Sequence, residues 1–355
     1  KNSTGDTEIK AGEDYSAAFD STTGFLTITM LAGGKGAAAT AIKVSGKVID
    51  PSKVTKEDVI GAVDPSTGAE TGAQVIRQVY PRLGIVPGLI LAPGWSQIPE
   101  VGLALAAKAA KINGVYSAMA LLDLDTAKAK KYTDTKSVKE ESGYTSPFCY
   151  PLWPCDRVGE YILAKSAVAG AMIQYMAADI EDVPNQSPSN HLLGVGGQCL
   201  EDGTEVYLDQ DQANTVNGYG VTTAINQNGY RLWGNYTGAY PASSDAKDIW
   251  FAVRRMFSWQ GNNFIQTYFD EVDDPMNNVL VQSVVDSENI RCSAYAPKYW
   301  AGASIEYKSD DNPKTAILAG TMKFRQHIAP YTPAQEIVDI IDYDTDTLAA
   351  AVGGN

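Results

Sequence analysis

The residue best placed for covalent chemistry in this sequence is Ser96. It follows a short apolar run, residues 89–92, and precedes Pro99, a residue type common in the first turn of a helix. A serine between a buried strand and a helix is the arrangement of a hydrolase nucleophile. The motif is incomplete, because Ile98 stands where a second glycine gives that sharp turn its room. A serine hydrolase or a ligand-binding protein that uses the crevice at Ser96 is therefore the alternative hypothesis, and a turn serine that caps the following helix is the simpler interpretation.

A nucleophilic serine also needs a general base, and the chain contains two histidines. His191 lies in a polar segment after Pro188. His327 alternates with Lys323 and Arg325, opposite the apolar residues of its segment, which predicts a solvated or interfacial side chain. The sequence therefore predicts no catalytic triad.

Glycine-rich and acidic segments are the other candidates, as phosphate and metal sites. Residues 33–36 lack the leading glycine and the hydroxyl residue of a phosphate loop, and residues 194–199 lack the third glycine of a dinucleotide loop, so both predict turns. Three acidic segments lack the spacing of a calcium loop and predict solvated faces or helix N-caps: 209–211, 270–274 and 342–346. Asn2 and Asn235 head glycosylation-like triplets, which have meaning only in a secreted protein. We predict no cofactor and no metal.

The elements around Ser96 predict a βαβ unit. Residues 89–92 and 117–125 have the continuous apolar character of strands buried on both faces. Between them, residues 101–112 are apolar almost all round, and the Asn-Gly pair that follows predicts a left-handed helix end. Strands joined through one helix by short connections are parallel. We therefore expect an α/β core domain, a mostly parallel sheet with helices on both faces.

Weaker patterns place the elements on either side of this unit. Residues 1–50 predict part of a small β module, with a turn at 20–24, a strand at 25–31 and a partner strand at 41–45. The other segments predict a helical region at 53–81 with a capping box at 55–58, a charged, loop-like or frayed stretch at 128–143, a strand at 148–153 and a buried helix at 158–178. Turns are predicted at 184–203, a strand at 205–208 and a helix at 210–217.

The last third of the chain predicts an α+β domain. Residues 249–269 have an amphipathic helical pattern, and a second helix runs from an Asp-Pro cap at 274 to about residue 289. Two alternating strands follow, at 303–307 and 321–329. A final apolar strand, 336–343, has no later segment to pair with. It is either an ordinary edge strand or an arm donated to another chain.

The composition narrows the possible partners. The 355 residues, 44% of them hydrophobic, can bury a large core divided into two or three domains. With 42 acidic against 28 basic residues, the net charge of −14 argues against nucleic acid or an anionic membrane as the main partner. The four cysteines form no CxxC pair and predict reduced thiols, although Cys149 and Cys155 are close in sequence. The most apolar helical run, 162–178, contains Lys165 and predicts a buried helix, not a membrane span.

Several segments together resemble one known family. Residues 228–237, Asn-Gly-Tyr-Arg-Leu-Trp-Gly-Asn-Tyr-Thr, are similar to a signature of the contractile tail sheath proteins of bacteriophages and phage-tail-like bacteriocins. Four further stretches resemble the same family in the same order: 87–96, 286–291, 310–313 and 333–337. The resemblance extends from about Pro51 to the C-terminus and is nearest to sheaths of phages and bacteriocins from Gram-positive bacteria.

The resemblance implies a structural protein and not an enzyme. Such subunits stack in helical rings around an inner tail tube and contract to drive the tube through a bacterial envelope. The implied partners are other sheath subunits, the inner tube protein, and the baseplate and tail terminator proteins, in a particle assembled in the bacterial cytoplasm and released by lysis. The family's α/β core is likened to subtilisin without its active site. Its C-terminal domain, here with the helix at 275–289, is expected to face the tube.

The resemblance also implies that strands from neighbouring subunits are added to the sheet of another subunit. The inter-subunit strand is assigned to the apolar residues of the last segment: Ile337, Val338, Ile340, Ile341 and Tyr343. The expected domains are a partial β module at 1–50, the sheath core at 51–240, a C-terminal α+β domain at 241–332 and an arm at 333–355. Family members carry an arm and opening strands before the region that matches Pro51, so a truncated or proteolysed chain is expected.

Overall fold

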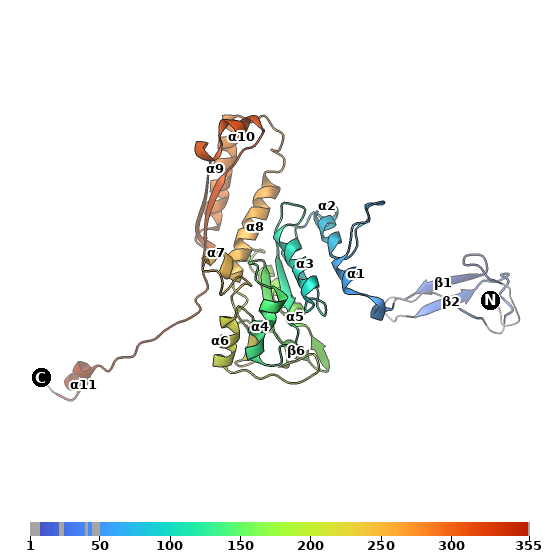
Figure 1. Ribbon diagram of the computed structural model, residues 1–355, viewed down its shortest axis with the longest axis horizontal. Coiled ribbons are helices and arrows are strands. Elements are labelled where there is room, and N and C mark those ends of the chain that lie inside the picture. Colours follow the sequence, from blue (N-terminus) through green and yellow to red (C-terminus); the bar gives the residue numbers. More distant parts are fainter. Residues whose placement is uncertain (1–7, 21–24, 40–41, 45–49, 354–355) are drawn as a thin grey trace. The chain divides into compact units, whose positions relative to one another are not determined.

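The computed structural model describes residues 8–20, 25–39, 42–44 and 50–353, in two compact units, Lys1–Val54 and Thr55–Asn355 (Figure 1). In the smaller unit, strand β1 (Tyr15–Phe19) pairs antiparallel with β2 (Leu26–Met30), and a short 3₁₀ helix, η1, spans Pro51–Lys53. The expected partner of β2 was 41–45, of which only 42–44 are described. The described partner is β1, in a register that pairs Tyr15 with Met30 and Phe19 with Leu26. Residues 21–24 of the expected turn lie outside the described residues.

The core of the larger unit is a parallel sheet in the order β3 (Leu89–Leu91), β4 (Met119–Asp123), β5 (Cys149–Leu152). Every residue of β4 is buried, as its continuous apolar run predicts. Helix α3 (Pro99–Ala110) joins β3 to β4 and begins with the expected proline. The predicted βαβ unit is therefore confirmed.

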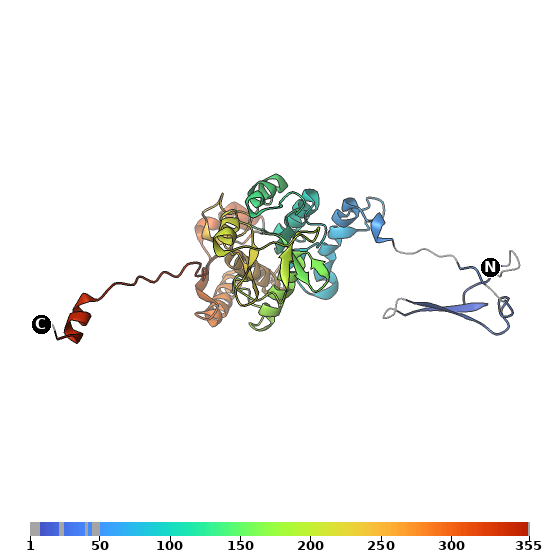
Figure 2. The ribbon, with the colours of Figure 1, turned by 90° about the horizontal axis from the view of Figure 1, so that it is seen from below.

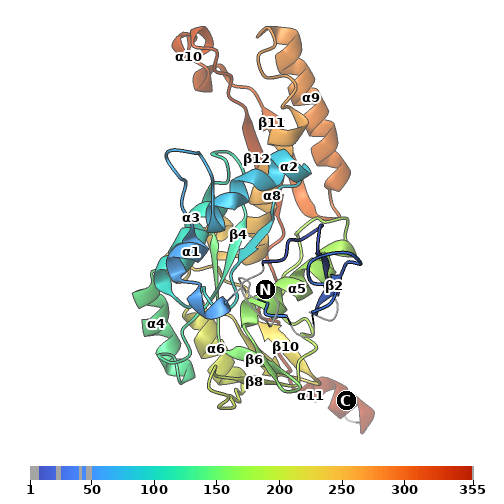
Figure 3. The same ribbon diagram turned by 90° about the vertical axis from the view of Figure 1, so that its right-hand side faces the viewer.

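Both faces of this sheet are covered by helices. Ala120 and Leu122 pack with α3, whereas Met119 and Leu121 face α5 (Lys165–Ala178). Figure 3 shows α3 and α5 on opposite sides of β4. Alternate residues of one apolar strand thus supply two separate clusters of the core.

Helices and turns precede this sheet. Helix α1 (Lys56–Ile60) starts at the predicted capping box, in which Thr55 and Asp58 exchange hydrogen bonds. The amphipathic segment after it is divided into a 3₁₀ helix, η2 (Gly72–Gln78), and α2 (Val79–Leu83).

The loop prediction for residues 128–143 is wrong. The segment contains η3 (Tyr132–Asp134) and α4 (Thr135–Ser142), which ends at Gly143 in a left-handed conformation. Its charged sequence concealed a buried side: Lys139 is only 3% exposed, and its amine donates to the carbonyl oxygens of Tyr219 and Tyr240.

A small antiparallel sheet replaces the first part of the expected 158–178 helix. Its order is β7 (Tyr161–Leu163), β6 (Cys155–Val158), β8 (Gly197–Cys199). The chain turns at Gly159, whose φ is 58°, so α5 begins only at Lys165. The strand predicted at 205–208 is reduced to one bridge, in which Glu205 pairs with Cys199 of β8. The Val206 amide also donates to the Gln198 carbonyl of β8.

The elements that follow agree more closely with the patterns. Helix α6 (Gln210–Gly218) begins at an Asp209 capping box, and β9 (Thr223–Asn226) forms a hairpin with β10 (Tyr230–Trp233). A bridge between Leu152 and Thr222 links this hairpin to β5.

Long helices and a hairpin complete the larger unit. Short α7 (Ala246–Ile249) leads to α8 (Phe251–Thr267), and α9 (Asn278–Tyr295) packs beside β11 (Trp300–Glu306), which pairs antiparallel with β12 (Arg325–Pro330). The predicted cap of α9 at 274 is wrong: Asn277 is the N-cap and accepts from the Leu280 amide. Between the strands lie η4 (Ser309–Asp311) and α10 (Lys314–Leu318), and the chain ends with α11 (Thr345–Ala351).

The result is a mixed α/β fold with one small parallel sheet and several small antiparallel sheets. Within the described residues, none of the helices has the length and apolar character needed to cross a membrane.

Candidate functional site

Ser96 lies in a closed hydrogen-bonded cluster rather than in a crevice. Its side chain is fully buried, and its hydroxyl donates to the Asp123 carboxylate at 2.9 Å and accepts from the Asp123 amide at 3.0 Å. The same carboxylate accepts from the amide and hydroxyl of Ser166, and burial raises its pKa. The N-cap of α3 is Ile98, without a side-chain cap, so the helix-capping interpretation of Ser96 is wrong. The serine instead ties the turn after β3 to the end of β4 and the start of α5.

The hydrolase hypothesis fails on this geometry. Ser96 cannot reach a substrate, and its backbone carbonyl is covered by the Tyr144 hydroxyl, which donates to it at 2.5 Å. His327 is exposed, as predicted, and lies 2.9 Å from a carboxylate oxygen of Glu306. His191 lies in a loop, where burial lowers its pKa.

The other sequence candidates have structural roles. Residues 33–36 lie in turns, as predicted, but the end of the 194–199 segment is strand β8. Asp209 and Asp344 are helix N-caps, and the described residues contain no metal-like cluster of His, Cys, Asp or Glu. Asn235 is 9% exposed and accepts from the Ser187 hydroxyl, whereas Asn2 lies outside the described residues.

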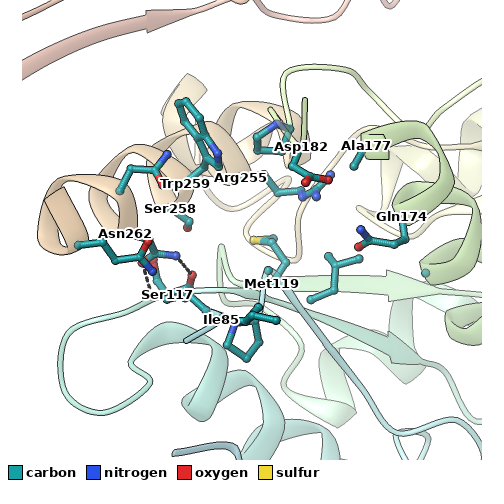
Figure 4. Close-up of a pocket in the computed structure, with 18 of the residues that line it drawn as sticks. Ile85, Ser117, Met119, Gln174, Ala177, Asp182, Arg255, Ser258, Trp259 and Asn262 are labelled. Atoms are coloured by element: carbon teal, nitrogen blue, oxygen red, sulfur yellow. Dashed lines mark hydrogen bonds between the residues drawn. The ribbon is translucent and has the colours of Figure 1, made fainter. Parts of the chain in front are cut away.

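A cleft of the larger unit lies between the edge of β3, α5 and α8 (Figure 4). Its volume is about 710 Å³, and Ser96 is not among its lining residues. Asn262 of α8 closes one end by accepting from the Ser117 amide and donating to the Ser117 carbonyl. The guanidinium of Arg255 lies 5.6 Å from the Phe251 ring centre, and burial lowers its pKa to about 10. The lining combines the Arg255 cation and the Asp182 carboxylate with side-chain amides and apolar groups.

Two asparagines from the segments that resemble sheath proteins fasten the C-terminal hairpin. The Asn289 side chain accepts from the Ile305 amide and donates to the Ile305 carbonyl, both at 3.0 Å. Asn312 makes the same pair of bonds with Lys323, at 2.7 and 2.9 Å. Each amide thus occupies a strand edge as a neighbouring strand would. The sequence analysis did not predict these roles. The available signal was that segments 286–291 and 310–313, which resemble sheath proteins, each contain an asparagine.

A buried charged network lies beneath this hairpin. Glu288 is fully buried and holds Arg291 through two bonds, at 2.9 and 2.5 Å. Gln260 of α8 donates to Glu288 at 2.6 Å and to the Gln326 side chain on β12 at 3.2 Å. The network joins α8, α9 and β12 and fixes how the hairpin lies on the two helices.

The two edges of the hairpin differ in what they offer. Ile305 lies opposite Gln326, and its backbone groups turn to Asn289, so this pair is of the non-hydrogen-bonded type. The backbone groups of Gln326 therefore face away from β11. Those of Ile328, two residues further along the strand, do the same. No described residue outside the hairpin bonds to them. The outer edge of β12 is open, whereas that of β11 is occupied.

The C-terminal arm, residues 333–343, leaves the body beside the β9–β10 hairpin. At its root the Tyr236 hydroxyl donates to the Gln335 side chain at 2.6 Å. The Tyr236 ring stacks on Tyr240 and Trp250, with ring centres 3.7 and 4.8 Å apart. Beyond this point the segment is extended and has no strand partner among the described residues (Figure 2).

The predicted inter-subunit residues of the arm are all exposed. Their exposed fractions range from 69 to 88%: Ile337, Val338, Ile340, Ile341 and Tyr343. Five large apolar side chains in one exposed segment are unusual for a monomer and are typical of an interaction surface.

Comparisons with known proteins connect these features to a family. No family model matches the sequence. The tail sheath protein of Burkholderia phage BcepMu is 27% identical, with 100% of this chain and 75% of that protein covered. The tail sheath protein of Escherichia phage P2 is 23% identical, with 80% and 69% covered.

Solved structures share the fold at low sequence identity. A chain of the contracted sheath complex of an extracellular contractile injection system, PVC, has a TM-score of 0.61 at 17% identity, with 78% of this chain and 76% of that chain covered. A chain of the anti-feeding prophage baseplate has a TM-score of 0.60 at 17% identity, with 85% and 83% covered.

The sequence relatives and the shared fold define a non-enzymatic structural subunit of a contractile machine. The chain is a tail sheath protein of the kind found in phage tails and contractile injection systems, and therefore a component of a phage tail or tail-like particle.

Proposed function

We propose that copies of this chain polymerise into a helical sheath through their C-terminal arms. Residues Ile337 to Tyr343 of one copy add as a strand to the open edge of β12 in a neighbouring copy. The observation that carries the proposal is the pairing of an exposed apolar arm without a partner and a strand edge whose backbone groups are unused. The two features lie on one chain, so each copy can both donate and accept.

Physical chemistry supports this exchange. Full burial of an apolar side chain contributes on the order of 1.5–3 kcal/mol, and the arm carries five such side chains. Main-chain hydrogen bonds along the strand would add orientation without depending on how the two bodies are tilted. A strand joint can therefore survive while subunits rotate from one packing to another during contraction, which draws on a metastable assembled state.

The arm and its acceptor also carry opposite charges. Asp339 and Asp342 lie on the arm, and Lys323 and Arg325 lie at the start of β12. Arg325 already pairs with Asp311 at 2.6 Å, but both groups are partly exposed and can exchange partners at low cost. Opposite charges would favour one strand direction over the other.

Deletion of the arm tests the proposal directly. The complete chain, a chain ending at Pro333 and a control ending at Asp344 would be compared by sizing chromatography and negative-stain electron microscopy. We expect rods or large oligomers from the complete chain and the control, and a folded monomer from the chain ending at Pro333. Equal assembly of all three would exclude the arm as the joint.

A peptide experiment tests donation without polymerisation. A fluorescent peptide of residues 334–344 should bind the chain ending at Pro333, and anisotropy would report the binding. The matched control peptide carries Ile340→Asp and Ile341→Asp and should not bind. Equal binding of both peptides would contradict a strand addition that depends on apolar side chains.

Further parts of the proposal follow the family resemblance. The exposed face of α9 carries Val279, Asp286 and Ile290, and we assign it to contact with the inner tail tube. Baseplate and tail terminator proteins are the proposed partners at the two ends of the sheath, in particles assembled in the bacterial cytoplasm and released by lysis. We also propose that the chain is most similar to sheaths from Gram-positive systems and that its core resembles subtilisin without an active site. The proposed domain boundaries lie near residues 50, 240 and 332.

A further inference from the structure

Two of the four cysteines face each other across an antiparallel ladder. Cys155 on β6 is the register partner of Cys199 on β8. Directly opposed residues in such a ladder have Cα atoms roughly 4.5–5.5 Å apart and side chains on the same face. A disulfide requires a Cα separation of roughly 4.4–6.8 Å. The backbone therefore already holds this pair within bonding range.

The ionisation of the Cys155 thiol reflects the same proximity. Burial raises the pKa of Cys155 to about 12, and the neighbouring Cys199 adds to the rise. The Lys165 ammonium acts in the opposite direction. Cys155 is partly exposed and Cys199 is fully buried, so a reagent from solvent meets Cys155 first.

The other two cysteines lack this arrangement. Cys149 is fully buried on β5, where its register partner is Ala120, and burial raises its pKa to about 11. Cys292 is buried on α9, and its thiol lies 3.8 Å from the Glu288 carboxylate. Neither faces another thiol across a strand pair.

We propose that Cys155 and Cys199 form a thiol–disulfide pair, reduced in the structure described here and closed by disulfide exchange in oxidising surroundings. The Cys155 thiolate attacks a low-molecular-weight disulfide and releases one thiolate, leaving a mixed disulfide on Cys155. The Cys199 thiolate then attacks the Cys155 sulfur and releases the second thiolate. The two protons lost by the cysteines end on the two released thiols, so the protein is oxidised by two electrons and the small disulfide is reduced.

The bond would link β6 covalently to β8 and would join the two ends of the segment 155–199. Such a cross-link removes conformational freedom from the unfolded chain and raises stability. Reduced thiols are expected inside a cell and disulfides outside it. The pair would therefore stiffen a released particle without affecting how the chain folds beforehand, and the inference does not depend on the proposed arm exchange.

Mass spectrometry of the native chain tests this pair. The folded, reduced protein is incubated with glutathione disulfide in mildly alkaline buffer, quenched, alkylated and digested. We expect the number of alkylated thiols to fall from four to two, with one cross-linked peptide pair that joins Cys155 to Cys199. The reaction should accelerate with rising pH because the attacking thiol has a raised pKa.

Serine variants supply the matched controls. C155S and C199S should lose the cross-link, whereas C149S and C292S should retain it, with circular dichroism used to check each fold. Oxidation should also raise the thermal midpoint of the unchanged chain by several degrees, and a reducing agent should reverse the rise. Four free thiols in the oxidant-treated native chain, a glutathione adduct that persists on Cys155, or a link between Cys149 and Cys155 would each overturn the proposal.

Discussion

At the scale of single residues, the polar groups that suggested chemistry serve to hold elements together. Ser96 and Ser166 saturate the buried Asp123 carboxylate. Lys165 forms a fully buried ion pair with Asp156. Such groups are costly to bury without partners, so their hydrogen bonds and ion pairs favour one arrangement of the turns that carry them.

Lys139 provides a pH-dependent prediction at this scale. Burial lowers the pKa of its amine to about 8 from an ordinary value of 10.5. Between these two pH values the unfolded chain holds more protons than the folded chain, so stability gains from rising pH in this window. The free energy of unfolding of the unchanged protein, minus that of Lys139→Met, should therefore rise by up to about 3 kcal/mol between pH 8 and pH 10.5.

Urea unfolding at several pH values would measure this difference. Below about pH 8 the difference between protein and variant should be constant, because the amine is charged in both states. Lys136→Met is the matched control, since Lys136 lies exposed on the same helix. A difference that stays flat through the whole window would show that the buried amine is not the titrating group.

At the scale of elements, side-chain amides complete strand edges that no strand covers. Asn289 fastens α9 to β11, Asn312 closes the loop that leads into β12, and Asn262 fastens α8 to Ser117 before β4. The Asn289 contact keeps β11 from accepting a foreign strand, whereas β4 is already paired on both sides, with β3 and β5. Within the C-terminal hairpin, the edge that stays open for association is therefore that of β12.

Asn289 is the element-scale position to change. Asn289→Ala removes both partners of Ile305 and should lower the free energy of unfolding by about 2–4 kcal/mol. Asn289→Asp keeps the acceptor but places a carboxylate oxygen against the Ile305 carbonyl, so its cost should be at least that of alanine. Urea unfolding gives the stabilities, and hydrogen exchange at the Ile305 amide checks that the lost bond is the cause. Ser287→Ala, at an exposed site on α9, is the control and should change little. Equal exchange rates at Ile305 in all variants would contradict this role for Asn289.

At the scale of the whole molecule, the chain combines a folded body with an exposed apolar arm and with an open strand edge on β12. This composition suits a protein whose working state is an assembly. The net charge of −14 keeps separate copies apart, so association requires a specific joint strong enough to outweigh repulsion.

A single charge in the arm should therefore abolish assembly without affecting the fold. Ile341→Asp places a carboxylate where the added strand must bury an apolar group, and we expect a monomer with the same thermal midpoint. Leu348→Asp on α11 is the matched control, because it adds the same charge outside the strand. Sizing chromatography and light scattering distinguish the outcomes, and assembly by Ile341→Asp equal to that of the control would count against the joint.

Local patterns in the sequence determined the central βαβ unit, α6, α8 and the β11–β12 hairpin. The reason is that continuous apolar runs, proline and Asn-Gly signals and strict alternation act over a few residues. The apolar segment near the C-terminus could also be recognised from the sequence, because its composition alone shows a run of apolar residues.

Only the tertiary structure decided the features that depend on distant partners. Helix α4 looked like a loop because Val138 is its single large apolar residue, and the rest of its buried side is polar: Thr135, Lys139 and Ser142. The hairpin β6–β7 and its partner β8 are joined across the segment that separates Cys155 from Cys199. The burial of Ser96, the amide clamps and the open edge of β12 likewise arise where segments far apart in the chain meet, and no local pattern encodes such meetings.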